Sequence, residues 1–157
     1  MENEIRASLT ELKLLPIGEG RWKKVDFCIY SDSTKEQFDE ARRKILDYVP
    51  HSTKGIYVLI KGEEVLYIGE SGSSIQKRMM RHIDKIYSRT DERSTFFKQP
   101  QNQGDLTYYY FELPLVSSTY RKLIEESMNI VVKPTYLDWT LHIKSQRLQE
   151  ILSSNTI

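Results

Sequence analysis

Residues 55–69, which are GIYVLIKGEEVLYIG, carry the strongest structural signal in the chain. β-branched and aromatic residues dominate on both sides of a short interruption at Lys61-Gly62-Glu63. This is the composition of two strands joined by a tight turn. We therefore predict a β-hairpin, with one strand over residues 55–60 and the returning strand over residues 64–68.

The apolar residues of this hairpin also predict its register. They alternate along both strands, at Ile56, Val58, Ile60, Leu66 and Ile68. Because successive side chains point to opposite faces, placing them all on one core face makes Ile56 pair with an even-numbered position such as Ile68. The same register brings Tyr57 and Tyr67 together on the other face. Taken singly, either tyrosine is explained as a good strand former.

The segment before the hairpin predicts one more strand and one helix. β-formers fill residues 25–30, where the odd-numbered apolar residues would share a face. Ser33, followed three residues later by Glu36, has the spacing of a capping box, and apolar residues then recur at helical spacing to about Tyr48. Residues 1–54 are therefore expected to form an N-terminal extension that contains a strand and a helix.

The segment after the hairpin predicts helices around one further strand. Ser73 and Gln76 have the spacing of a second capping box, which would open a helix ending near Ser88. A polar loop is expected over residues 89–104. The remaining elements are a strand over residues 106–113, a helix from Ser117 or Ser118 to about Ile130, and a last helix over residues 141–153.

The order of these elements predicts the fold class. From Gly55 onward it is strand, strand, helix, strand, helix, which is typical of an α+β domain with a small antiparallel three-stranded sheet flanked by helices. We expect this domain to span residues 55–138, with residues 139–157 as a C-terminal helix that packs on it.

Composition limits the class of protein. The chain has 157 residues, 39% of them hydrophobic, which suits one domain. It contains no apolar run long enough to cross a bilayer, so no membrane partner is expected. The N-terminus lacks the apolar core of a signal peptide. Cys28 is the only cysteine, which excludes an intramolecular disulfide and makes a reducing, cytoplasmic location the expectation.

Charge excludes a strongly basic nucleic-acid coat, because the net charge is only +1. Any nucleic-acid interface must therefore be local. Positive charge gathers in one short segment, which covers the helix predicted after the hairpin and the residue that follows it, at Lys77, Arg78, Arg81, His82, Lys85 and Arg89. Helical spacing puts most of these cations beside an apolar stripe, so the helix can pack inward and present them outward. A solvated surface helix has the same pattern.

Two short motifs and their spacing resemble a known family. Gly55-Ile56-Tyr57 is followed after nine residues by Tyr67-Ile68-Gly69. The segment Lys77-Arg78-x-x-Arg81-His82 resembles the corresponding segment of phage intron-encoded homing endonucleases. The stretch from Glu125 to Pro134-x-Tyr136 resembles the C-terminal element of excision-repair incision nucleases. Over residues 55–138 the chain thus resembles the GIY-YIG nuclease superfamily, with its elements in the expected order.

This resemblance implies a metal-dependent DNA endonuclease. Tyr57 would be the general base for the attacking water, helped by nearby positive charge because a free tyrosine has a pKa of about 10. Tyr67 would orient water or phosphate. Arg78 would hold the scissile phosphate with its planar donor fork, and His82 would assist there. A lone histidine on a helix, without the resemblance, is expected at the surface.

The resemblance also implies a cofactor and a partner. Glu125 would bind the metal, Mg²⁺ or Mn²⁺, which is satisfied by one carboxylate with waters and phosphate oxygens. Glu125 and Glu126 both flank the apolar stripe of their predicted helix, so periodicity does not choose between them; the spacing to Pro134 favours Glu125. DNA would be the partner, with further contacts from Lys77, Arg81 and Lys85. Cutting both strands with one site per chain favours a homodimer.

Three departures from the family pattern keep other functions open. Glu70 stands where many relatives have lysine, one extra residue separates Gly69 from Arg78, and Leu137-Asp138 stands where many relatives have asparagine. The alternative is a nucleic-acid-binding module on the same fold with weak or lost catalysis. A third reading is a protein-interaction domain in which both tyrosines are structural.

Overall fold

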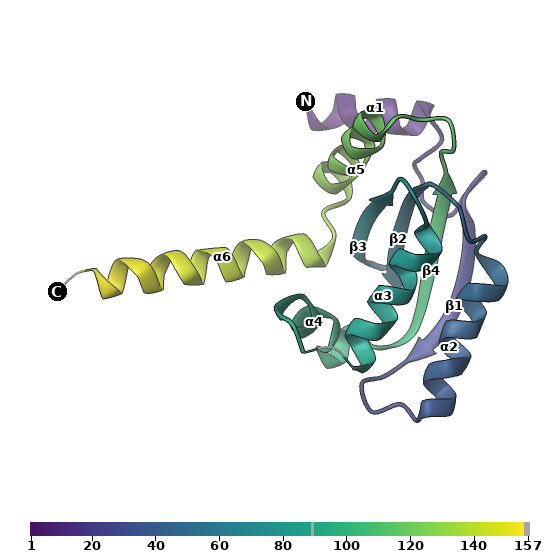
Figure 1. The fold of residues 1–157 in the computed structure, drawn as a ribbon. Helices are drawn as coiled ribbons and strands as arrows, with labels where there is room; N and C mark the ends of the chain where they lie inside the picture. Colours follow the sequence, from purple (N-terminus) through teal and green to yellow (C-terminus); the bar gives the residue numbers. More distant parts are fainter. Residues whose placement is uncertain (89, 156–157) are drawn as a thin grey trace.

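An antiparallel sheet of four strands forms the centre of the computed structural model, which describes residues 1–88 and 90–155. The strands are β1 (Lys23–Ile29), β2 (Gly55–Lys61), β3 (Glu64–Ser71) and β4 (Gly104–Glu112). Their spatial order is β1-β4-β2-β3 (Figure 1). The α+β class is confirmed, but the prediction of three strands is wrong. β1 comes from the N-terminal segment and pairs with β4 along its whole length, covering an edge that would otherwise stay open.

The hairpin has the predicted register parity from Gly55 to Leu59. Val58 pairs with Ile68 and Ile56 pairs with Glu70, both even-numbered partners. Beyond a bulge after Leu59, Ile60 pairs with the odd-numbered Val65, and Leu66 packs in the cluster of Tyr57 and Leu59, so the prediction that all the apolar residues share one face is wrong. The specific pairing of Ile56 with Ile68 is wrong, because the strands run on to Ser71 and a bulge follows Leu59. The face opposite the predicted core is also buried, since helices cover both sides of the sheet.

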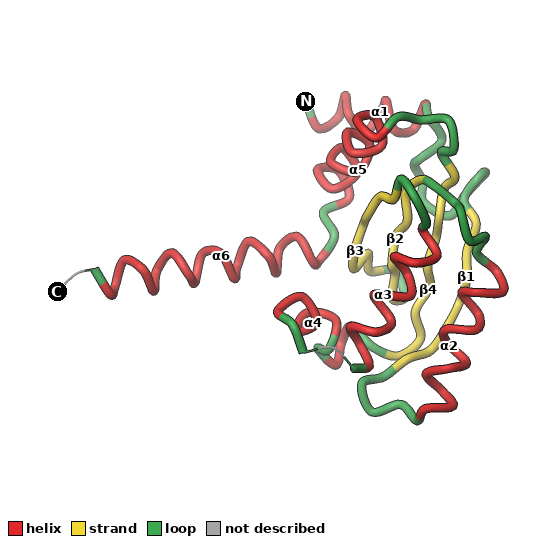
Figure 2. Tube along the Cα trace, in the orientation of Figure 1, coloured by secondary structure: helices red, strands yellow, loops and turns green. Residues whose placement is uncertain are grey.

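Six α-helices surround the sheet within the described residues. They are α1 (Glu2–Glu11), α2 (Lys35–Tyr48), α3 (Ile75–Tyr87), α4 (Glu92–Phe97), α5 (Ser118–Val132) and α6 (Thr135–Ser154). Helices α2, α3 and α4 pack on the face that carries Tyr57 and Leu59. Helices α1 and α5 pack on the face that carries Ile56 and Val58 (Figures 1 and 2). The two tyrosines of the hairpin therefore face α3.

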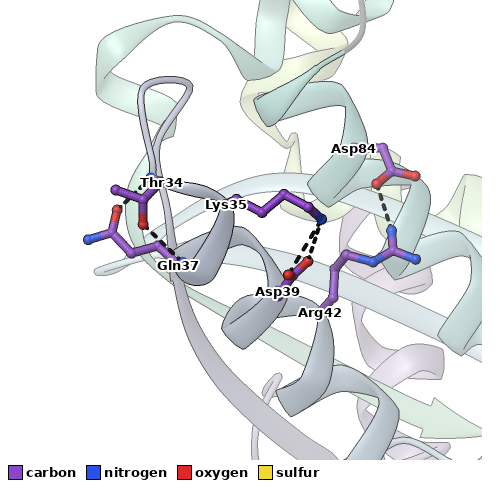
Figure 3. Close-up of polar contacts among 6 residues, drawn as sticks. All are labelled: Thr34, Lys35, Gln37, Asp39, Arg42 and Asp84. Atoms are coloured by element: carbon purple, nitrogen blue, oxygen red, sulfur yellow. Dashed lines mark hydrogen bonds and ion pairs between the residues drawn. The ribbon is translucent and has the colours of Figure 1, made fainter.

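The N-cap of helix α2 lies one residue later than predicted. Thr34, not Ser33, is the N-cap, and it exchanges hydrogen bonds with Gln37 in a capping box (Figure 3). The Oγ of Ser33 instead accepts the backbone N–H of Tyr30. Farther along α2, Arg42 donates to Asp84 of α3 at 2.7 Å, which ties the two helices together on one side of the sheet (Figure 3).

Helix α3 starts without the predicted capping box. Ser74 caps it by accepting the backbone N–H of Lys77, while Ser73 lies outside the cap. The side chain of Gln76 reaches away from the helix end and donates to the backbone of Val49 at 2.7 Å. This bond anchors the start of α3 to the end of α2.

Three other segments differ from the sequence prediction. The expected loop over residues 89–104 contains α4 and a 3₁₀ turn, Pro100–Asn102, because Asp91 caps a helix that buries Phe96 and Phe97. Helix α1 is not predicted by the sequence pattern. Helix α6 begins before Leu141, at Thr135, and extends away from the body of the protein (Figure 1). No residue of α6 is buried, although Trp139 packs partly on the core. None of the described helices is long and apolar enough to span a membrane.

Candidate active site

Two tyrosines of the hairpin lie at the centre of the candidate site. Tyr57 on β2 is 2% exposed, and its ring centroid lies 6.0 Å from that of Tyr67 on β3. They are diagonal neighbours, because Tyr57 pairs with Gly69 and Tyr67 pairs with Leu59. The prediction that both tyrosines share a face is therefore confirmed.

Gly69 makes room for the ring of Tyr57. A Cβ at position 69 would lie 2.5 Å from both Cζ and Oη of Tyr57, which is far inside van der Waals contact. The ring of Tyr57 therefore requires glycine at position 69, the last residue of the motif Tyr67-Ile68-Gly69. At the same end of the hairpin, Gly55 pairs with Ser71 and has φ +149°, and a Cβ there would collide with the backbone of Phe111.

His82 is buried against both tyrosines and is not a surface residue. It is 3% exposed on α3, and its Nε2 lies 3.4 Å from Oη of Tyr57. Its ring centroid lies 4.6 Å from that of Tyr67. Burial lowers the pKa of His82 well below its ordinary value of 6.5, and the charges of Lys85, Arg78 and Arg93 lower it further. The imidazole is therefore neutral at physiological pH.

Arg78 lies one helical turn before His82 on α3 and is exposed. Its positive charge lowers the pKa of Tyr57, as expected, but burial acts more strongly and raises that pKa well above 10. Burial also raises the pKa of Tyr67, and the negative charge of Glu125 adds to this rise. Both tyrosines are therefore protonated in the free protein.

Glu125 reaches the same region from α5. It is partly buried, and its pKa is raised from 4.5 to about 7 by burial, then by Glu70 and Glu126, while Arg78 opposes the rise. Glu126 is exposed. The charge of Glu125 raises the pKa of Tyr67, and the charge of Arg78 lowers the pKa of Glu125. Of the two glutamates, Glu125 is therefore the better placed to bind a metal at this site.

Glu70 is held by an arginine that the sequence analysis did not single out. Arg121 on α5 donates through Nε to Glu70 at 3.3 Å, and it also donates to the backbone of Val116. The two side chains are 9% and 14% exposed. A positive charge therefore does stand beside β3, but it comes from α5 and is paired with Glu70. Arg121 lies one helical turn before Glu125, so this pair also helps to fix α5 at the site.

Other predicted and unpredicted residues surround this centre. Lys77 and Arg81 are exposed on α3, and Lys85 lies 5.6 Å above the ring of Phe97. Arg89 is outside the described residues. Tyr136 packs on Tyr67, with ring centroids 5.0 Å apart, whereas Leu137 and Asp138 follow it on α6. Arg93 on α4 is a further neighbour that is not among the predicted site residues. The sequence signal for its helix is Asp91, which caps α4 ahead of Phe96 and Phe97.

The residues fit a metal that needs few protein ligands. Among the described residues, no group of three or more His, Cys, Asp or Glu side chains could hold an ion. Glu125 offers one partly buried carboxylate, whose pKa is raised by burial and by the neighbouring Glu70 and Glu126, so a cation beside it would favour its charged form. A single carboxylate with waters and substrate oxygens is how Mg²⁺ is commonly bound.

Comparison with protein-family models, with curated proteins and with solved structures finds no match for this chain.

Proposed function

We propose that the chain is a divalent-metal-dependent DNA endonuclease that hydrolyses phosphodiester bonds. One observation supports this most strongly: four elements bring two tyrosines, a neutral histidine, an exposed arginine and a partly buried glutamate to one place. The residues are Tyr57, Tyr67, His82, Arg78 and Glu125. This is a set with a proton acceptor, a phosphate-binding cation and a metal-binding carboxylate.

The proton of the attacking water has a path through Tyr57. Because Tyr57 is protonated, it can take a proton from the water only as it gives its own to His82. The neutral imidazole, whose Nε2 lies 3.4 Å from the Tyr57 hydroxyl, is the base within reach of that proton. Burial lowers the pKa of His82 and so opposes this transfer. The water oxygen then forms its bond to phosphorus while the bond from phosphorus to the leaving oxygen breaks.

Arg78 is the residue that would hold the scissile phosphate. It is exposed, and its planar donor fork matches phosphate oxygens. Mg²⁺ or Mn²⁺, held by Glu125, would supply charge neutralisation at the phosphate and the leaving oxygen.

A nucleic-acid-binding module with weak catalysis is the second candidate. It is favoured by the pKa of Tyr57, which burial raises well above 10, so the phenolate form is scarce without proton transfer to His82. This candidate shares the cationic face of α3 with the first and differs from it only in turnover.

A plasmid assay separates the two candidates. Supercoiled DNA is incubated with Mg²⁺ or Mn²⁺ and the wild type, Glu125→Gln or Arg78→Ala, with Arg43→Ala as a control on α2. An endonuclease nicks or linearises the plasmid with the wild type and the control but not with the two site variants. Early linear product indicates the proposed homodimer. If the wild type binds DNA at low salt and cuts no better than Glu125→Gln, the binding module remains; if it does not bind, both candidates fail.

A further inference from the structure

Helix α4 places an arginine beside the candidate site. Phe97 on this helix is fully buried, and its ring centroid lies 4.8 Å from that of His82 and 5.9 Å from that of Tyr67. Arg93 precedes Phe97 by one helical turn, so the two side chains leave α4 on the same side. The helix is thus fixed against the site by its phenylalanine and carries the guanidinium at the rim.

Arg93 carries a charge that no described residue pairs with. It is exposed, and it forms no hydrogen bond or ion pair within residues 1–88 and 90–155. The acidic neighbours on α4 are engaged elsewhere, since Asp91 caps the helix through Ser94 and Glu92 pairs with Arg147 of α6. The positive charge of Arg93 acts on Tyr67 and on His82. An arginine that pairs with none of the described residues can bind an anion at this place.

We propose that Arg93 binds a phosphate of the DNA strand next to the scissile phosphate, which Arg78 holds. This inference rests on the proposed function. The two arginines approach His82 from different helices, α3 and α4, and a nucleic-acid strand offers its phosphates in a row. Two separate guanidinium groups at one site therefore fit two successive phosphates of one strand, and the strand passes from α3 over the tyrosines to α4.

The first test measures DNA affinity as a function of salt. A labelled duplex that contains a mapped cleavage site is titrated with wild type, Arg93→Ala, Arg93→Lys and Arg43→Ala in Ca²⁺ by fluorescence anisotropy. Arg93→Ala is expected to bind about tenfold more weakly, since a hydrogen bond to a charged group is lost. The slope of log affinity against log salt should fall by about 0.9. Arg93→Lys should keep most of that slope, and Arg43→Ala should match the wild type.

The second test locates the phosphate. Single phosphates around the mapped cleavage site are replaced by neutral methylphosphonates. Wild type should lose affinity when the phosphate next to the scissile one is neutral, and Arg93→Ala should lose nothing further at that position. The proposal is overturned if the wild type cuts DNA while Arg93→Ala binds and responds to salt as Arg43→Ala does. It is also overturned if neutralising the phosphate next to the scissile one weakens DNA binding by Arg93→Ala as much as it weakens binding by the wild type. If the wild type neither binds nor cuts DNA, the proposed function fails as well.

Discussion

The hydroxyl of Tyr57 lies 3.4 Å from Nε2 of His82, and this contact joins β2 to α3 inside the protein. Both rings are buried, and burial keeps both neutral by raising one pKa and lowering the other. Nδ1 of His82 has no hydrogen-bond partner among the described residues, so the contact with Tyr57 and the surrounding rings orient the imidazole. The two neutral rings lie within reach of each other, while burial disfavours the charged forms that proton transfer between them would create.

Substitution of either member of this pair should lower turnover by a similar amount. Tyr57→Phe removes the hydroxyl, and His82→Ala removes its acceptor, so each is expected to reduce kcat by about a hundredfold or more. Because the two act as a unit, the double variant should lose little more than either single variant. Single-turnover cleavage of a labelled duplex measures this. Additive losses would contradict a shared proton path and would leave the two residues with separate roles.

A methyl group at position 69 should disturb the site more than the fold. Gly69→Ala puts a Cβ 2.5 Å from the Tyr57 hydroxyl and ring, so Tyr57 must move. We expect a loss of stability of about 1–3 kcal/mol from overpacking, together with a large loss of kcat. Gly62→Ala is the control, because its φ of +61° makes alanine strained while its Cβ would contact nothing. Urea unfolding and duplex cleavage check this. Equal activity of the two variants would show that the position of Tyr57 is unimportant.

Periodicity predicts the features that depend on neighbours in sequence. The hairpin parity follows from the alternation of Ile56 and Val58, and it correctly places Tyr57 and Tyr67 on one face. Helices α2, α3 and α5 follow from their spacing of apolar residues. The absolute register differs because a bulge after Leu59 is decided by strand packing, which the apolar pattern does not encode.

Features that depend on distant segments are not predicted. The N-terminal strand looks like part of an extension in sequence, but its backbone completes the sheet beside β4. Residues 89–104 are polar enough to resemble a loop, yet Phe96 and Phe97 anchor α4 in the core. For the same reason Arg93 and Arg121 were not recognised, since only the fold brings them near the tyrosines.

The ion pair between Glu70 and Arg121 should stabilise the connection of β3 to α5. Arg121→Met leaves Glu70 buried without its partner and is expected to destabilise the protein by about 3 kcal/mol. Glu70→Gln combined with Arg121→Met should recover part of this loss, with a coupling of about 1–3 kcal/mol in a double-mutant cycle. Glu70→Lys should destabilise the protein because it faces Arg121 with a like charge. Urea unfolding of Arg121→Met, Glu70→Gln, the double variant and Glu70→Lys checks this, and additive losses of the two single variants of the cycle would contradict the pairing.

Glu125 should make the protein less stable as pH rises, because its pKa is raised from 4.5 to about 7 in the folded state. Between these values the folded protein binds more protons than the unfolded chain, so the free energy of unfolding falls with increasing pH. Glu125→Gln removes this effect and should therefore melt higher than wild type at pH 8 but equally at pH 4, although we expect it to be inactive. Mg²⁺ should raise the melting temperature of wild type and not of the variant. Scanning calorimetry at both pH values measures these changes, with Glu126→Gln, an exposed neighbour, as the control. Equal melting temperatures of Glu125→Gln and Glu126→Gln at pH 8, with and without Mg²⁺, would remove Glu125 from the metal site.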